Sequence, residues 1–85
     1  MENKFIKAAR EAVVKYYNTD MDPGERPLEY DETFVVWFSK TLQNWKALVS
    51  TVRGNSYFEL TYNGDKKELY LDYYMKQDNV VMREE

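Results

Sequence analysis

The residue types that most enzymes use for chemistry near neutral pH are missing from this sequence. Its 85 residues include no histidine and no cysteine. A Ser-His-Asp triad, a cysteine nucleophile and metal sites built on imidazole or thiolate are therefore excluded. Neither a P-loop nor a GxGxxG pattern occurs, so phosphate binding of those kinds is not predicted. We expect no catalytic residues and no cofactor, and we expect the protein not to be an enzyme.

Carboxylates are plentiful, and they are densest in the segment 19–32. Asp20, Asp22 and Glu25 are superficially similar to an oxygen-ligand cluster for calcium. The calcium-loop pattern requires Gly at its sixth position and Glu at its twelfth. Counted from Asp20, these positions hold Glu25 and Asp31, so the pattern fails. We interpret the segment as a solvated acidic loop and predict no metal site.

The middle of the chain combines aromatic and basic side chains. Residues 33–67 hold 5 basic and 2 acidic side chains, whereas the whole chain has a net charge of −3. Proteins that bind single-stranded nucleic acid combine stacked aromatics with a basic groove. The residues in question are Trp37, Lys40, Trp45, Lys46 and Arg53. Nucleic-acid binding by residues 33–67 is thus an alternative function, but the acidic total favours ordinary packing of these aromatics.

One amphipathic helix is predicted at the N-terminus, over residues 3–18. Its apolar stripe has helical spacing, and Asn3 is placed to cap its start. The stripe consists of Phe5, Ile6, Ala9, Ala12, Val13, Tyr16 and Tyr17, with Lys4, Lys7, Arg10, Glu11 and Lys15 on the remaining surface. An acidic loop follows over residues 19–32, where Pro23-Gly24 and Pro27 break the helical pattern. Leu28 and Tyr30 could attach this loop to the domain.

Four strands with short connections are predicted in the sheet region 33–75. The predicted strands are residues 33–42, 45–52, 57–62 and 67–74, and Asn63-Gly64-Asp65 is the strongest hairpin signal. Short connections imply an antiparallel meander. Residues 76–85 are either a short fifth strand around Val80–Met82 or a tail. The predicted fold class is α+β, a single domain of one N-terminal helix packed on a four-stranded antiparallel meander sheet.

The helix can cover one face of this sheet and leaves the other uncovered. We predict that the helix packs on Phe34, Val36, Phe38, Phe58, Leu60, Leu69 and Leu71. The helix-free face would then carry Val35, Trp37, Tyr57, Tyr70 and Tyr74, with Trp45 near a turn. A monomer rarely leaves so much apolar surface exposed to solvent, and Tyr and Trp are favoured at protein interfaces. A partner protein or a second copy covering this face is one interpretation, and a Tyr-rich face tolerated in water is the other.

These patterns select a set of candidate binding residues. They are Trp37, Tyr70 and Tyr74 on the predicted helix-free face, and Lys40, Asn44, Trp45 and Lys46 around the first hairpin. The leading hypothesis is a non-enzymatic module that binds a protein partner through these residues. No signal peptide, disulfide or membrane-spanning run is found in the sequence, so we expect a cytoplasmic location and no membrane partner.

A family resemblance adds a biological setting. The segments that show this resemblance are Lys40–Asn44, Lys46–Leu48, Ser50-Thr51 and Leu60–Asp72, and the opening residues 1–18 are similar as well. On these residues the chain resembles a family of small phage and prophage proteins of Gram-positive bacteria whose function is unknown. The resemblance implies an accessory protein that acts on a host or defence protein, and it supplies no functional residues.

Overall fold

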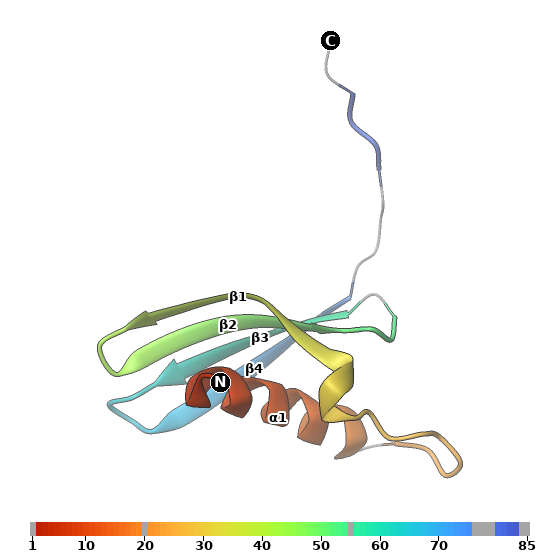
Figure 1. Cartoon of the computed structure of the whole chain (residues 1–85), viewed down its shortest axis with the longest axis horizontal. Helices are drawn as coiled ribbons and strands as arrows, with labels where there is room; N and C mark the ends of the chain where they lie inside the picture. The colour runs from red at the N-terminus through yellow and green to blue at the C-terminus, as the bar shows by residue number, and fades with distance from the viewer. Residues whose placement is uncertain (1, 20, 55, 76–79, 84–85) are drawn as a thin grey trace.

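A computed structural model describes residues 2–19, 21–54, 56–75 and 80–83 of the chain. Its elements are helix α1 (Lys4–Thr19), a short 3-10 turn η1 (Tyr30–Glu32) and four strands: β1 (Thr33–Thr41), β2 (Asn44–Thr51), β3 (Ser56–Asn63) and β4 (Glu68–Met75). The strands form one antiparallel sheet in the order β1-β2-β3-β4, and α1 lies on one side of it (Figure 1). The predicted α+β meander is thereby confirmed.

The N-terminus of α1 is fixed by the predicted cap. The side-chain Oδ1 of Asn3 accepts a hydrogen bond of 2.7 Å from the backbone N–H of Phe5. This bond satisfies one of the donors that a helix start leaves without a partner. The apolar stripe of α1 faces the sheet, where Ala9 and Val13 are completely buried. Two small residues at this contact allow the helix backbone to approach the sheet closely.

The core lies between α1 and the two central strands. Trp45, Ala47 and Val49 of β2 and Phe58 and Leu60 of β3 are buried there. We call this side of the sheet the covered face. Leu28 of the acidic loop joins the same core and is only 2% exposed. The prediction that Leu28 attaches the loop to the domain is therefore confirmed.

The loop is held in place by an amide side chain of α1. Asn18 donates a hydrogen bond of 3.0 Å from Nδ2 to the carbonyl oxygen of Leu28 and accepts one of 2.8 Å from its backbone N–H. The Asn18 amide thus pairs with both the backbone N–H and the backbone C=O of Leu28, as a residue of a neighbouring β-strand would do. Burial of the Leu28 side chain thus leaves none of its backbone groups without a partner.

A β-bulge in β1 overturns part of the predicted core. Val35 pairs with Val49 and Trp37 pairs with Leu48, so Val36 is an extra residue between two neighbouring pairs. One extra residue shifts the side-chain alternation by one position. Val35, predicted on the helix-free face, consequently packs on the core, and Phe38 remains on the covered face as predicted. Phe34 and Val36, predicted in the core, are exposed by 47% and 49%.

The position of α1 explains two further differences. The helix contacts β1 and β2 and lies farther from β4. Tyr16 reaches Phe58 and Tyr73 with its ring but stays 49% exposed, and Leu69 on β4 is 40% exposed. Both side chains face the direction predicted for them, yet a single helix is too narrow to cover the fourth strand.

The end of the chain does not join the sheet in its described part. Val80, Val81 and Met82 have no strand structure and are exposed. Residues 76–79, 84 and 85 lie outside the described residues, so the choice between a fifth strand and a tail is open for them. Within the described ranges, no helix is long and apolar enough to cross a membrane.

Candidate functional site

The side of the sheet opposite α1 carries the candidate site, and we call it the open face. The strand pairing places four cross-strand rows on it. From the end near the β2–β3 turn, the first three rows are Phe34–Ser50–Tyr57–Tyr74, Trp37–Leu48–Glu59–Asp72 and Ser39–Lys46–Thr61–Tyr70, and the fourth consists of the pairs Thr41–Asn44 and Asn63–Glu68. The first two rows are mostly apolar and the last two are mostly polar.

The first two rows form an aromatic half, defined by Phe34, Trp37, Leu48, Tyr57 and Tyr74. The four aromatic side chains are 38–51% exposed. Tyr57 and Tyr74 are direct cross-strand partners, as are Trp37 and Leu48. Cross-strand partners on one sheet face lie close enough for their side chains to interact, so Leu48 and Ser50 of β2 connect the rings of β1 with those of β3 and β4 on one face.

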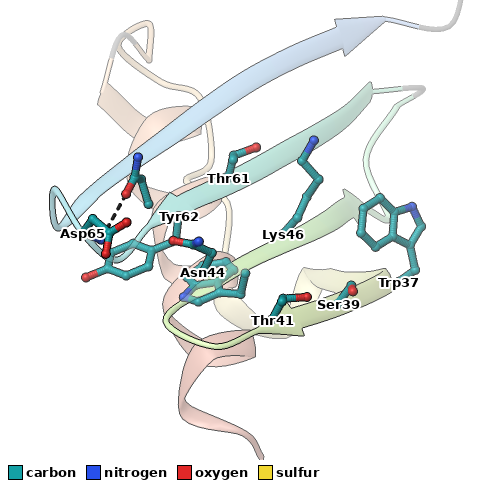
Figure 2. Close-up of a pocket in the computed structure, with 10 residues that line it drawn as sticks. Trp37, Ser39, Thr41, Asn44, Lys46, Thr61, Tyr62 and Asp65 are labelled. Atoms are coloured by element: carbon teal, nitrogen blue, oxygen red, sulfur yellow. Dashed lines mark hydrogen bonds between the residues drawn. The ribbon is translucent and has the colours of Figure 1, made fainter.

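The last two rows form a polar half with a shallow, open depression of about 550 Å³. Figure 2 shows Trp37 at one end of it and Asp65 at the other, with the polar side chains between them. The hydroxyls and amides that line the depression belong to Ser39, Thr41, Asn44, Thr61 and Asn63, and Lys46 contributes an ammonium group. The rings of Trp45 and Tyr62 also border it. This lining offers hydrogen bonds to a ligand without a strong acid or base at its centre.

Two hairpin tips meet at the end of the depression. The side-chain Oδ1 of Asn44 accepts a hydrogen bond of 2.8 Å from the backbone N–H of Gly64, and Gln43 donates one to Asp65. A Cβ atom at Gly64 would lie 2.2 Å from the carbonyl oxygen of Gln43. Only glycine therefore permits this approach of the β3–β4 turn to the β1–β2 turn.

The structure places five of the seven predicted binding residues together on the open face. Trp37, Asn44, Lys46, Tyr70 and Tyr74 all point to that side of the sheet. The other two candidates lie on the covered face. Trp45 is 5% exposed and stacks on Tyr62 at 5.6 Å between ring centroids. Lys40 pairs with Trp45 across the strands and places its Nζ 5.3 Å from the Phe5 ring centroid.

The charges of the open face are mainly negative. Its described strand residues include Glu59, Glu68 and Asp72 but only one base, Lys46. Lys46 lies 3.7 Å from a Glu59 carboxylate oxygen. The Tyr70 hydroxyl donates a hydrogen bond of 3.0 Å to Glu68, which raises the pKa of Tyr70 above its usual range. The excess of carboxylates makes this face complementary to a basic surface.

The basic residues of 33–67 do not gather into one patch. Lys40 lies on the covered face, Lys46 on the open face, and Lys66 and Lys67 in the β3–β4 turn. Arg53 is engaged elsewhere: its guanidinium donates to both carboxylate oxygens of Glu32, at 2.6 and 3.0 Å. A nucleic-acid groove needs contiguous positive charge, and this arrangement disperses it.

Arg53 and Glu32 belong to an ion-pair cluster that sequence reasoning missed. Arg53 also donates hydrogen bonds of 2.7 Å to the carbonyl oxygens of Arg26 and Pro27. The bonds from Arg53, from the Glu29 backbone N–H and from Arg26 lower the pKa of Glu32 to about 2. The cluster joins the acidic loop to the β2–β3 turn, and nothing in the local sequence pairs residues so far apart.

Arg10, predicted on the helix surface outside the apolar stripe, makes contacts that the sequence does not indicate. It donates to the side-chain oxygen of Thr33 at 2.8 Å and to the carbonyl oxygens of Tyr30 and Thr33 at 3.0 Å. Its guanidinium also lies 3.9 Å from the centroid of the Tyr30 ring. Arg10 therefore fixes the start of β1 to α1. The arginine fork suits this task because its several donors diverge in one plane.

The acidic residues do not assemble into a metal site in the part of the chain that is described. Among those residues, no group of three or more acidic side chains is close enough to hold a metal ion. Asp20, the first residue of the supposed calcium pattern, lies outside the described residues. The Glu29 and Glu32 backbones and side chains are used in forming η1.

The comparisons with known proteins give a family and no activity. A family model described as "Family of unknown function (DUF6275)" matches residues 6–84. Since the match covers nearly the whole sequence, the chain belongs to this family. No match was found among curated proteins, and none among solved structures.

Proposed function

We propose that this protein is a non-enzymatic binding module whose open face receives a protein partner. The observation that carries the proposal is the aromatic half, in which Phe34, Trp37, Tyr57 and Tyr74 stand 38–51% exposed on one face of the sheet. Exposed aromatics that form one surface are typical of protein–protein contacts, where buried Trp and Tyr provide much of the affinity.

The charge of the same face indicates the chemistry of the partner. Glu59, Glu68 and Asp72 border the aromatic side chains, and one of them is already close to Lys46. A partner with an apolar patch flanked by Lys or Arg would fit both features. Such charges mainly set the rate and the specificity of association, while the aromatic contacts supply affinity. The dispersed basic residues support a protein partner over the alternative, a nucleic acid.

The absence of catalysis is also part of the proposal. The depression beside the aromatic half is lined by hydroxyls, amides, the Lys46 ammonium group and the Asp65 carboxylate, together with the rings of Trp37, Trp45 and Tyr62. The sequence has no histidine or cysteine to activate any of them. We assign this polar half to hydrogen bonding with the partner at the rim of the interface, where polar contacts are usual.

The biological setting rests on the resemblance to small phage and prophage proteins. Under this proposal the partner is a host or defence protein of a Gram-positive bacterium, met in its cytoplasm. The chain would act by occupying a surface of that protein. Nothing in this mechanism requires a cofactor, a metal ion or a membrane.

Affinity capture from host lysate with matched variants tests the proposal. The tagged protein is compared with Trp37→Ala and Tyr74→Ala on the open face and with Leu42→Ala and Val52→Ala as controls. The control side chains are 79% and 69% exposed and lie outside the aromatic half. A protein that survives nuclease treatment, is lost with the first two variants and is retained by the controls supports the proposal. Loss of all captured material on nuclease treatment, or equal capture by all variants, contradicts it.

The two tryptophans allow a direct measurement on the identified partner. Trp37 is 41% exposed and Trp45 is 5% exposed, so a soluble quencher acts almost entirely on Trp37. Binding on the open face should protect Trp37 from iodide and shift its emission to shorter wavelength. Unchanged quenching at a saturating concentration of the partner would place the contact elsewhere on the molecule.

A further inference from the structure

The two edges of the sheet differ in how they are protected. Strand β1 contains the Val36 bulge, carries Lys40 and is tied to α1 through Arg10. Bulges and lysines are the usual devices that prevent an edge strand from pairing with another chain. Strand β4 has none of them: it pairs with β3 in unbroken register from Glu68 to Met75 and contains no Lys, Arg, Pro or Gly.

The outer edge of β4 also borders exposed apolar surface. On the covered side, Leu69 and Tyr73 are 40% and 45% exposed, because α1 packs mainly on β1 and β2 and reaches Tyr73 with the ring of Tyr16. In the described residues no segment pairs with this edge, and Val80–Met82 lie outside the sheet. A regular edge without a bulge, lysine or proline, beside exposed Leu and Tyr, is a template for strand addition, and Glu68 and Asp72 restrict which strand can add to it.

We propose that β4 pairs antiparallel with β4 of a second copy of this chain, forming a continuous eight-stranded sheet. A two-fold axis perpendicular to the sheet keeps the open faces of both copies on the same side. Under this symmetry the strand pairs about one central residue, and only a few registers are possible. The acidic residues of β4 decide among these registers.

Registers centred on Tyr70 or Asp72 bring like charges together. In the register centred on Tyr70, Glu68 of each copy lies opposite Asp72 of the other copy. In the register centred on Asp72, the two Asp72 side chains lie opposite each other. Like charges directly opposite destabilise a strand pair. A register centred on Leu71 avoids both conflicts and still pairs seven of the eight residues of β4.

The register centred on Leu71 is self-complementary on both faces. On the open face, Tyr70 lies opposite the second copy's Asp72, and Tyr74 lies opposite the second copy's Glu68. A tyrosine hydroxyl can donate to a carboxylate there, as Tyr70 already does to Glu68 within its own strand. On the covered side, Leu69 meets the second copy's Tyr73 and Leu71 meets its equivalent, so the exposed apolar side chains cover one another.

The size of the contact sets its expected strength. One strand edge buries less than the roughly 800 Å² per partner of a standard interface. We therefore expect a dimer with a dissociation constant in the micromolar range, visible as a rise in mass from 10.3 kDa toward twice that value with concentration. This dimer forms along the edge of β4, and its contacts on the open face come from β4 alone, so it can be tested on the purified chain without the proposed partner.

Sedimentation equilibrium of the purified full chain, with charge-reversed variants, tests the proposal. Tyr70→Lys places a cation opposite the second copy's Asp72 and should tighten the dimer, whereas Tyr70→Glu places a like charge there and should weaken it. Because each dimer contains the contact twice, we expect the two dissociation constants to differ by about tenfold or more. The same changes at Tyr57, which lies on the inner strand β3, should leave dimerisation unchanged. A monomer up to millimolar concentration, or equal effects at both positions, would overturn the proposal.

Thiol cross-linking tests the register separately. The chain has no cysteine, so single Leu69→Cys and Tyr73→Cys variants each carry one thiol. In the register centred on Leu71, these two positions are direct partners, whereas each lies four residues, about 13 Å, from its own equivalent. A short bifunctional thiol reagent should cross-link the mixture of the two variants and neither variant alone. Cross-linking of one variant with itself, or none in the mixture, would contradict this pairing.

Discussion

Trp45 and Trp37 lie on neighbouring strands of one sheet, and their surroundings are opposite. Trp45 is 5% exposed on the covered face, among the rings of Phe5, Phe38 and Tyr62. Trp37 is 41% exposed on the open face, beside Leu48. The covered face thus supplies the burial that stabilises the fold, whereas the open face leaves its aromatic side chains exposed.

The sharpest test of this comparison removes one side chain from each face. Leu60→Ala on the covered face should lower the free energy of unfolding by about 2–5 kcal/mol, because a fully buried side chain is lost and a cavity remains. Trp37→Ala on the open face should cost about 1 kcal/mol or less. Urea unfolding, followed by circular dichroism, measures both. A larger cost for Trp37→Ala than for Leu60→Ala would contradict the division of the two faces.

The contact between the hairpin tips belongs to neither face, and we expect an intermediate effect there. Gly64→Ala places a Cβ against the carbonyl oxygen of Gln43 and should cost about 1–3 kcal/mol of unfolding free energy through overpacking. Asp65→Ala removes the side-chain contact between the tips without this clash and should cost less. Equal stabilities of the two variants would mean that the tips separate freely.

The acidic loop offers a test of how the covered face is closed at its edge. Asn18→Ala removes both hydrogen bonds to the backbone of Leu28 and should lower the free energy of unfolding by about 1–2 kcal/mol. Thr19→Ala removes one hydrogen bond within α1 and serves as the control. Hydrogen exchange of the Leu28 amide should accelerate in Asn18→Ala and stay slow in the control. Unchanged exchange would show that burial of Leu28 alone holds the loop.

The smallest change in the free energy of unfolding is expected on lowering the pH, through protonation of Glu32 in its cluster with Arg53. The pKa of Glu32 falls from 4.5 to about 2 on folding, chiefly through the hydrogen bonds from Arg53. A lowered pKa contributes stability that is present above pH 4.5 and is lost as the pH falls toward 2. Glu32→Gln should therefore flatten this part of the stability profile, while Glu25→Gln in the exposed loop should not. Parallel profiles for the wild type and Glu32→Gln would contradict the assignment.

Local sequence patterns were enough for the elements of the fold. The apolar stripe from Phe5 to Tyr17 predicted the ends of the helix to within one residue, and the predicted ends of the strands also agree to within one residue. The hairpin signal at Asn63-Gly64-Asp65 marked a real turn, although its loop extends to Lys67 because Asn63 Oδ1 binds the N–H groups of Asp65 and Lys66. Periodicity and turn chemistry act between near neighbours, so they can be read directly from the sequence.

The candidate site was predicted only in part. Strict alternation correctly placed Tyr57, Tyr70 and Tyr74 on the face opposite the helix. It failed before the bulge, where Phe34 and Val35 exchanged faces, and no sequence signal marks Val36 as the extra residue. Trp45 was selected because it follows a turn, but its neighbours across the sheet and on α1 decide that it is buried.

The sequence by itself determined which secondary structure forms and which chemistries are impossible. Propensity, spacing and the absence of histidine and cysteine can be read from the sequence without knowing which distant residues meet in space. Only the tertiary structure decided which face each side chain of β1 occupies, which arginines are engaged and which sheet edge is unprotected. Those outcomes depend on contacts between residues far apart in the chain, such as Arg10 with Thr33 and Arg53 with Glu32. Long-range packing and charge pairing, and not local preference, therefore give this small sheet its covered face, its open face and its two unlike edges.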